Sequence, residues 1–391
     1  MNHSWNIRKF GDICTSELGK TRDEKRNKGS FRPYLCAINV QWDRFELSDL
    51  KEMRFEDNEY DRYTVRKGDL VICEGGDIGR AAIWDKEEPI HYQNALHRVR
   101  FDNGVNARFI LYYLYFLKQA GILDGRYGKG VTIKHLVKSS LLSIPVPVPP
   151  LNEQQRIVDE LDLLTGIIDK KNAQLRDLDA LAQSIFYEMF GDPSAAFYGR
   201  SDSALKIGDF SECIAGATPS TKINSYWSNG TIPWLSSGEV AKGRVFATDT
   251  MISQEGYDSC STRLVPKNSV LIAMAGQGKT RGTVGISGIE LCTNQSICSI
   301  IVNDKIILPD YLYYELKLLY NELRSISNGD GGRGGLNLKL IQGFSVIVPD
   351  IEEQMTFVKR AKAIETQKAL IQDSLIQSKI LLDSRMSYYF G

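Results

Sequence analysis

The sequence of 391 residues contains no apolar run of about 18 residues, the length that a membrane-spanning helix needs. Its first residues, Met1 to Trp5, lead directly into a polar segment without the apolar stretch of a signal peptide. The seven cysteines are scattered, and none forms a Cys-x-x-Cys pair. An odd set of separate cysteines is typical of reduced thiols, so we expect a cytoplasmic protein that does not contact a membrane.

Motifs for nucleotide, metal or nucleophile chemistry are missing or incomplete. The segment ending in Gly278-Lys279-Thr280 resembles a Walker A loop, but Ala273 stands where this loop requires its first glycine. The glycine-rich residues 329–334 follow an expected helix, whereas a dinucleotide-binding loop follows a strand. The four histidines show no metal-ligand spacing with the cysteines, and the sequence holds no methyltransferase tetrapeptide. We therefore predict no catalytic residue and no metal site.

The net charge is zero, with 48 Lys and Arg residues against 48 Asp and Glu residues. A lone DNA-binding domain is usually clearly basic. If this chain binds DNA, either its basic residues are gathered on one face or a partner supplies many of the phosphate contacts.

The sequence repeats itself when it is shifted by 200 positions. Matching residues keep one register from end to end, whereas chance matches would scatter. The matches include Pro33 with Pro233, Leu35 with Leu235, Val40 with Val240, Asn94 with Asn294, Glu153-Gln154 with Glu353-Gln354, and Phe190-Gly191 with Phe390-Gly391.

Each half begins with a globular part, residues 1–148 and 205–348, that is rich in short strand-like runs broken by Gly, Asn, Asp and Pro. One aromatic, helix-like stretch interrupts each part, at residues 108–118 and 309–323. This composition predicts two repeated α+β domains dominated by strands.

Each half ends in a long expected helix, residues 149–192 and 349–391, and residues 193–204 form the linker between the halves. Residues spaced alternately by four and three form a coiled-coil seam over more than four heptads. The seam positions are Ile157, Leu161, Leu164, Ile168, Lys171, Leu175, Leu178, Ala182, Ile185 and Met189 in the first helix, and Phe357, Ala361, Ile364, Lys368, Ile371, Leu375, Ser378, Leu382, Arg385 and Tyr389 in the second.

A helix of about 40 residues, about 60 Å long, needs a partner to cover such a seam. Antiparallel pairing of the two helices would cover both seams and would make them a rod between the two globular domains. The alternative is that the seam is an interface between separate chains.

Several short motifs recur in the order in which they occur in one known family. They are Gly216-Ala217-Thr218-Pro219-Ser220, Ile232-Pro233-Trp234-Leu235, Cys292-Thr293-Asn294-Gln295, Val346-Ile347-Val348-Pro349 before Glu353-Gln354, and Pro149-Pro150-Leu151-Asn152-Glu153-Gln154. With the duplication, they resemble the specificity subunit of type I restriction–modification systems over the whole chain. The first half departs from the pattern, since Lys20-Thr21-Arg22 replaces the Thr-Pro-Ser stretch and Gln93-Asn94 inverts Asn-Gln.

The resemblance implies a pseudo-two-fold α+β protein in which two long antiparallel helices separate two target recognition domains. It implies a non-catalytic subunit that reads a bipartite site in double-stranded DNA, one half-site per domain. The implied partners are two adenine-N6 methyltransferase subunits and two restriction–translocase subunits. S-adenosylmethionine, ATP and Mg²⁺ would then belong to the partners, and this chain would bind no cofactor.

Candidate DNA-binding residues lie in loops and carry side chains that contact phosphates or the edges of guanine and adenine. In the first domain they are Lys20, Arg22, Lys25, Arg26, Asp77, Arg80, Arg126 and Lys129. In the second domain they are Thr218, Ser220, Lys222, Gln277, Lys279, Arg281, Arg333 and Asn337. Asn94 and Asn294 lie in apolar surroundings, and we expect them to be structural.

Two other functions are compatible with the sequence. The chain could be a two-domain scaffold that binds protein without DNA specificity, or a self-contained nuclease or methyltransferase. A salt-sensitive DNA complex formed with a methyltransferase partner would favour the specificity subunit over the scaffold. An activity assay on the purified chain would reveal an enzyme.

Overall fold

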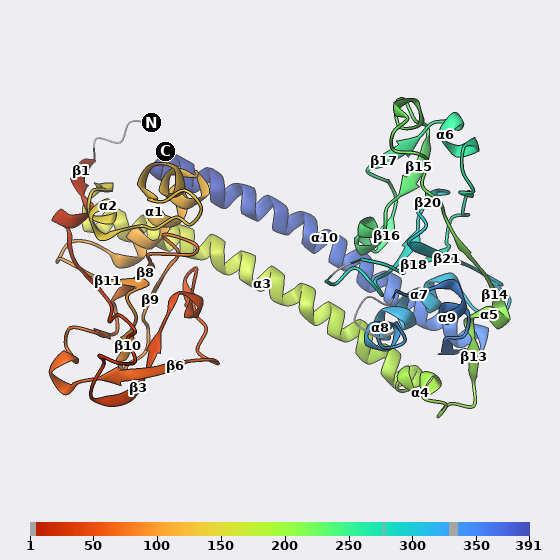
Figure 1. Cartoon of the computed structure of the whole chain (residues 1–391), viewed down its shortest axis with the longest axis horizontal. Helices are drawn as coiled ribbons and strands as arrows, with labels where there is room; N and C mark the ends of the chain where they lie inside the picture. The colour runs from red at the N-terminus through yellow and green to blue at the C-terminus, as the bar shows by residue number, and fades with distance from the viewer. Residues whose placement is uncertain (1–4, 277, 328–334) are drawn as a thin grey trace. The chain divides into compact units, whose positions relative to one another are not determined.

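The computed structural model describes residues 5–276, 278–327 and 335–391. They form two compact units: unit 1 contains the residues up to Asn172 together with Asp373–Gly391, and unit 2 contains Ala173–Gln372. Each unit includes part of both long helices, α3 (Leu151–Phe190) and α10 (Ile351–Phe390), whose course is drawn in Figure 1. Within the described residues, no helix is both long and apolar enough to span a membrane.

Unit 1 is built on two four-stranded sheets. Its strands are β1 (Asn6–Lys9), β2 (Cys14–Leu18), β3 (Ser30–Leu35), β4 (Val40–Gln41), β5 (Arg44–Phe45), β6 (Lys51–Phe55), β7 (Thr64–Val65), β8 (Leu70–Cys73), β9 (Ala81–Ile83), β10 (Ile90–Tyr92), β11 (Leu96–Phe101) and β12 (Pro145–Val148). One sheet has the order β2-β11-β8-β9, and the other has the order β6-β3-β10-β7. The α-helices that precede α3 are α1 (Ala107–Gln119) and α2 (Lys138–Leu142).

Unit 2 repeats this plan with five strands in its main sheet and three in its second sheet. Its strands are β13 (Ala204–Lys206), β14 (Ser211–Ala215), β15 (Ile232–Leu235), β16 (Arg244–Val245), β17 (Thr250–Ile252), β18 (Val270–Ala273), β19 (Val284–Ser287), β20 (Cys292–Thr293), β21 (Ile297–Val302) and β22 (Ser345–Ile347). The main sheet has the order β14-β21-β18-β19-β16, so its first four strands match β2-β11-β8-β9 of unit 1. The internal repeat is therefore confirmed in the fold.

Continuous apolar runs form the middle strands of both main sheets. All residues of β8 and β18 are buried, as expected for strands covered on both faces. The aromatic helix α1 begins after Asn106, whose side chain accepts hydrogen bonds from the backbone N–H groups of Arg108 and Phe109. Short helices complete unit 2: α4 (Ser194–Phe197), α5 (Ile207–Phe210), α6 (Gln254–Asp258), α7 (Pro309–Leu318), α8 (Tyr320–Ser325) and α9 (Leu338–Gln342).

Two details differ from the sequence analysis. The aromatic stretch expected as one helix at residues 309–323 is divided into α7 and α8. The expected linker contains α4, and the ring of Phe197 stacks on Phe344 with 5.2 Å between ring centroids. Part of this linker is therefore packed structure, because its aromatic side chain finds an apolar partner in unit 2.

The two long helices pair in antiparallel fashion within each unit. In unit 1, Tyr389 Oη donates to Glu160 Oε2 at 2.6 Å, and Lys171 Nζ donates to Ser378 Oγ at 2.7 Å. In unit 2, the rings of Phe186 and Phe357 meet at 5.3 Å. Every predicted seam position is buried or half-buried, so the helices cover their seams within the chain and the predicted coiled coil is confirmed.

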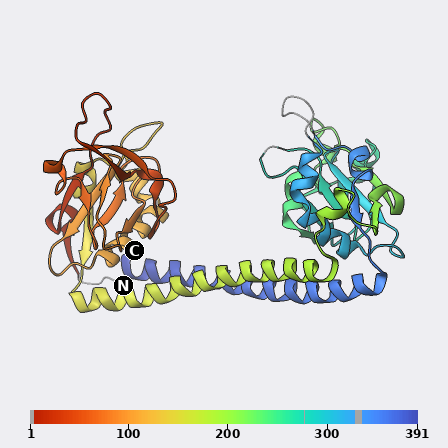
Figure 2. The same cartoon turned by 90° about the horizontal axis from the view of Figure 1, so that it is seen from below.

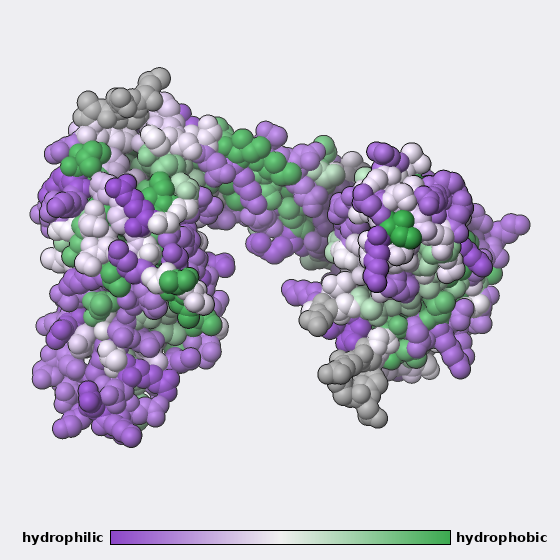
Figure 3. Space-filling model, turned by 45° about the horizontal axis from the view of Figure 1, so that its top comes forward, coloured by the Kyte–Doolittle hydropathy of each residue, from purple (hydrophilic) through white to green (hydrophobic). Residues whose placement is uncertain are grey.

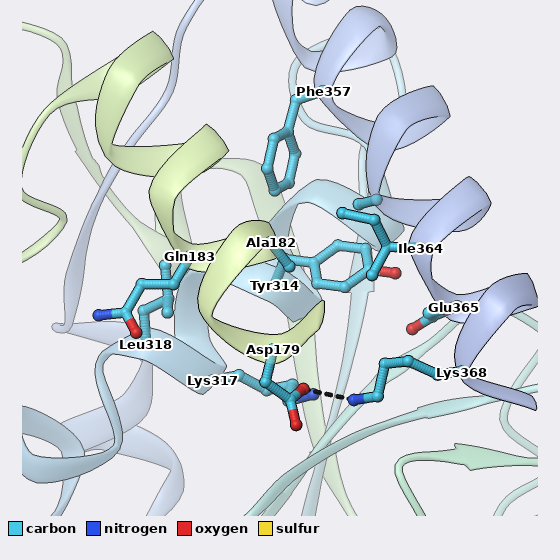
Figure 4. Close-up of a pocket in the computed structure, with 11 residues that line it drawn as sticks. Asp179, Ala182, Gln183, Tyr314, Lys317, Leu318, Phe357, Ile364, Glu365 and Lys368 are labelled. Atoms are coloured by element: carbon cyan, nitrogen blue, oxygen red, sulfur yellow. Dashed lines mark hydrogen bonds and ion pairs between the residues drawn. The ribbon is translucent and has the colours of Figure 1, made fainter. Parts of the chain in front are cut away.

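The seam between the long helices is less completely filled in unit 2 than at the equivalent positions of unit 1. A cavity of about 200 Å³ lies between α3, α7 and α10, and the ion pair of Asp179 with Lys368 lies at its lower side in Figure 4. Ala182 and Ala361 line this cavity. The corresponding seam positions in unit 1 carry the buried side chains of Leu382 and Leu161, so the cavity follows from two small residues.

In the Glu-Gln pair at the start of each long helix, the glutamine has a structural role. Gln354 is fully buried: its Oε1 accepts from Leu308 N, and its Nε2 donates to Ile306 O and Pro349 O, all within 2.8–3.0 Å. Gln154 repeats these contacts in unit 1. The glutamine therefore fastens the start of the long helix to the segment before the aromatic helix.

Replacing Gln354 with alanine is expected to lower the free energy of unfolding by about 2–4 kcal/mol, because three partly buried backbone groups lose their partner. Urea unfolding of the purified chain, followed by circular dichroism, measures this change. Met355→Ala is the control, since the adjacent Met355 side chain is 51% exposed. Equal unfolding midpoints for the two variants would contradict the assigned role of Gln354.

Candidate DNA interface

The loops that carry the candidate residues of unit 1 emerge at one edge of its main sheet, where β2 and β8 end and β11 begins. Glu74 N donates to Ala95 O at 2.9 Å, and Leu136 N donates to Glu74 O at 2.6 Å. Lys20 lies beside Gln93 in a parallel bridge. These contacts bring together residues 19–29, 74–80 and 126–136, which we call the loop edge of unit 1.

Unit 2 has the same arrangement at the ends of β14 and β18. Met274 N donates to Ser296 O at 2.8 Å, and Leu336 N donates to Met274 O at 3.0 Å. The described parts of residues 216–222, 274–282 and 335–337 form the loop edge of unit 2. Because this backbone pattern occurs in both units while the loop sequences differ, the two edges offer one frame with two different sets of side chains.

One glycine makes the close backbone approach possible at each loop edge. A Cβ atom on Gly19 would lie 2.3 Å from Gln93 O, and one on Gly216 would lie 1.8 Å from Thr293 O. Any side chain at these positions would force the two segments apart. This explains why a glycine precedes the first candidate loop in both repeats.

In Figure 2 two loops of unit 1 project from the side that faces away from its portions of the long helices: a dark red loop that follows β2 and a yellow-orange loop near residue 130. Five candidate side chains of the unit 1 loop edge are exposed: Arg22, Lys25, Arg26, Arg126 and Lys129. Asp23 shapes the first loop, because its Oδ1 accepts from Lys25 N and Arg26 N. These exposed cations suit contact with phosphates.

Three other candidates of unit 1 have partners within the unit. Lys20 is 7% exposed and forms an ion pair with Glu59, 39 positions away in the sequence. Asp77 pairs with Lys118 Nζ at 2.7 Å, and Arg80 Nη2 donates to Ala37 O at 2.8 Å. These contacts hold the loop edge in shape.

The candidates of unit 2 are similarly divided. Ser220, Lys222 and Lys279 are exposed, whereas Arg281 is half-buried. Thr218 Oγ1 donates to Gln295 Oε1, and Asn337 Oδ1 accepts from Leu340 N and so caps α9. The remaining two, Gln277 and Arg333, lie outside the described residues.

One apolar side chain of the unit 1 loop edge was not singled out from the sequence. Val131 is 99% exposed at the tip of a loop closed by two hydrogen bonds between Lys129 and His135. In DNA complexes, exposed apolar side chains contact the methyl group of thymine. Its position between Gly130 and a lysine, Lys134, is the signal that could have marked it.

His97 fixes the base of this loop from the buried side. Its ring is inaccessible to solvent, and its Nε2 donates to Leu136 O at 2.7 Å. Burial lowers the pKa of His97 to about 4, although the hydrogen bond to Leu136 opposes that change. The unfolded chain, with a histidine pKa of about 6.5, therefore binds more protons than the folded chain between these two values.

Stability is accordingly expected to fall as the pH is lowered from 7.5 to about 5, with His97 contributing about 2 kcal/mol of the loss. Urea unfolding at several pH values measures the dependence. His97→Gln keeps a side-chain N–H donor without a group that titrates in this range, so its curve should fall less steeply. If the two proteins lost stability in parallel, the assignment of this pH dependence to His97 would be wrong.

The described residues contain no group of three or more His, Cys, Asp or Glu side chains placed to hold a metal ion. The hydrogen-bond donors of both loop edges are cationic side chains, amide and hydroxyl groups, and backbone N–H groups. Such an arrangement can bind an anionic backbone and can donate hydrogen bonds to base edges.

The known proteins that resemble this chain belong to one family. The type I restriction modification DNA specificity domain matches the chain twice, over residues 2–177 and 203–378. The EcoR124I/EcoR124II specificity subunit of Escherichia coli is 24% identical over 297 residues, which are 74% of this chain and 70% of that protein. The putative type I restriction enzyme MjaX specificity subunit of Methanocaldococcus jannaschii is 22% identical over 385 residues, 92% of this chain and 87% of that protein.

A solved structure shares the fold. It is the crystal structure of the S subunit of a type I restriction–modification system from M. genitalium. The alignment covers 100% of this chain and 97% of the S subunit, with a TM-score of 0.59 at 14% identity. The strand-rich domains and long helices predicted from the sequence therefore occur together in an experimentally determined structure.

Proposed function

Because the chain belongs to the type I restriction–modification DNA specificity family and is a specificity subunit with two target recognition domains, we propose that it reads a bipartite site in double-stranded DNA. Each domain, residues 1–148 and 205–348, reads one half-site through its loop edge. The helices within residues 149–192 and 349–391 determine the separation of the half-sites.

The observation that supports this proposal best is the repeated backbone frame of the two loop edges. The hydrogen bonds from Leu136 N to Glu74 O and from Leu336 N to Met274 O occupy equivalent places. The side chains on these frames differ, with Lys25 and Arg26 exposed in one unit and Ser220 and Lys222 in the other. Two similar frames with unlike side chains suit the reading of two unlike sequences.

We further propose that the long helices bind two adenine-N6 methyltransferase subunits and, in restriction, two ATP-dependent translocase–nuclease subunits. Apolar side chains outside the seam support this, and Figure 3 shows such side chains on the surface of the helices. The exposed apolar side chains there include Leu163, Ile376 and Ile380 on unit 1 and Leu181 and Leu370 on unit 2. S-adenosylmethionine, ATP and Mg²⁺ would be bound by the partners.

The test uses the chain alone and the chain purified with the methyltransferase subunit of its host. Alone, it should transfer no methyl group, hydrolyse no ATP and cleave no DNA. With the partner, it should bind a DNA duplex in a salt-sensitive manner and methylate a split sequence. No DNA binding at any salt concentration would favour the protein scaffold, and turnover by the chain alone would indicate an enzyme.

A further inference from the structure

Residues 278–282 of the unit 2 loop edge lie between β18 and β19 and carry the candidates Lys279 and Arg281. Gly278 has a φ of +64° and Gly282 has a φ of +83°, so the segment depends on backbone conformations that glycine adopts readily. Gly278 and Lys279 are exposed. Hydrogen bonds from Gly282 N to Ala273 O at 2.8 Å and from Thr283 Oγ1 to Lys279 O at 2.9 Å hold part of this connection.

Helix α8 provides further contacts to the segment. Arg324 Nη1 donates to Gly278 O at 2.8 Å and to Arg281 O at 2.9 Å. One turn earlier on the same helix, Tyr320 Oη donates to Lys279 O at 3.0 Å and accepts from Arg324 Nη1 at 3.0 Å. Two side chains thus bind three carbonyl groups of the segment, and the charge of the guanidinium strengthens its hydrogen bonds.

Unit 1 has a comparable contact at the equivalent strand connection, between β8 and β9. Lys118, in the last turn of α1, binds Asp77 at 2.7 Å and Asp124 at 2.9 Å. The chemistry differs, because Lys118 binds carboxylates and Arg324 binds carbonyl groups. In both units, however, a cation from the helical segment holds the connection that carries candidate DNA-binding residues.

We propose that Arg324 is a positioning residue for the half-site read by unit 2: it fixes the conformation in which Lys279 and Arg281 meet the DNA, without itself contacting a base. Lys118 has the corresponding role for the other half-site. This proposal rests on the proposed function. Arg324 is half-buried and its Nη1 is already bound to two carbonyl groups, so it acts through the segment.

The test compares Arg324→Ala and Arg324→Lys with wild type, each in complex with the methyltransferase partner. DNA duplexes carry the recognised sequence or one base change in either half-site. For Arg324→Ala we expect discrimination at one half-site to fall by about tenfold or more, equivalent to one lost specific contact, while the other half-site is read as before. Arg324→Lys should be intermediate, because an ammonium replaces the planar guanidinium.

Two further measurements separate positioning from other roles. The slope of log K against log salt should stay unchanged, whereas loss of a phosphate contact would reduce it by about one. Lys118→Ala should affect only the opposite half-site, and Lys305→Ala, an exposed cation remote from the loop edge in the sequence, should affect neither. Melting temperatures of the variants show whether the fold is retained.

Unchanged discrimination in a folded Arg324→Lys and Arg324→Ala complex would overturn the proposal. An equal loss at both half-sites would also overturn it, since that result indicates only general destabilisation. A reduced salt slope with discrimination intact would identify Arg324 as a phosphate contact instead. A wild-type complex without any split sequence preference would refute the proposed function itself, which is a separate outcome.

Discussion

Inserting seven residues after Leu175 and seven after Leu375 is expected to abolish methylation at the original site, because the complex either recognises a longer spacer or loses binding. One heptad preserves the alternating seam of both helices. At ~1.5 Å per residue, the helix pair lengthens by roughly 10 Å. This equals about three base pairs at ~3.4 Å per pair and also rotates one half-site by roughly a quarter turn or more.

Methylation of synthetic duplexes with a graded series of spacers measures the effect. The complex should use a spacer that is about three base pairs longer, or should lose binding because the half-sites no longer face the two loop edges. As a control, seven residues inserted after Leu175 alone should shift one helix against the other and destabilise the fold. Full activity of the double insertion at the original spacer would mean that the helices do not set the half-site separation.

Replacing Gln277, Lys279 and Arg281 together by alanine is expected to weaken recognition of one half-site by roughly 1–3 kcal/mol for each lost bidentate contact. Lys279 is exposed, and the backbone around it is held by a hydrogen bond from Tyr320 Oη to Lys279 O. Both features support a role of this segment in reading bases. Competition binding with duplexes altered in one half-site measures the change.

The matched control replaces Lys25 and Arg26, the exposed cations of unit 1. As a loss of phosphate contacts, this variant should weaken binding to all duplexes and reduce the salt dependence of binding, while discrimination at both half-sites is retained. If the triple substitution lowered discrimination at both half-sites to the same degree, the two domains would not read DNA independently.

Much of the architecture could be predicted because its signals are local or periodic. The seam from Ile157 onward required only heptad spacing, and the repeat required only a constant shift. The division of each unit into two sheets could not be predicted, since β3 pairs in parallel with β10, more than 50 residues later in the sequence. Pairing over such distances leaves no periodic trace in a single sequence.

The candidate loops could be located from the sequence, but the state of each side chain could not. Lys20 and Lys25 occur in the same basic segment, yet Lys20 is bound to Glu59 whereas Lys25 is exposed. Asn337, by contrast, could have been recognised as a helix cap, because it directly precedes a helix-forming run. The role of Arg324 could not be predicted, because its partners are backbone carbonyl groups, which every residue type has.

The most direct test of two domains that read one split site is methylome sequencing of cells that contain this chain and its methyltransferase partner. We expect one motif with two specific parts separated by a fixed number of unspecified base pairs, with a methylated adenine in each part. In the same experiment, the triple substitution at residues 277, 279 and 281 should alter one part only. A contiguous motif, or the same change in both parts, would contradict the reading of one split site by two independent domains.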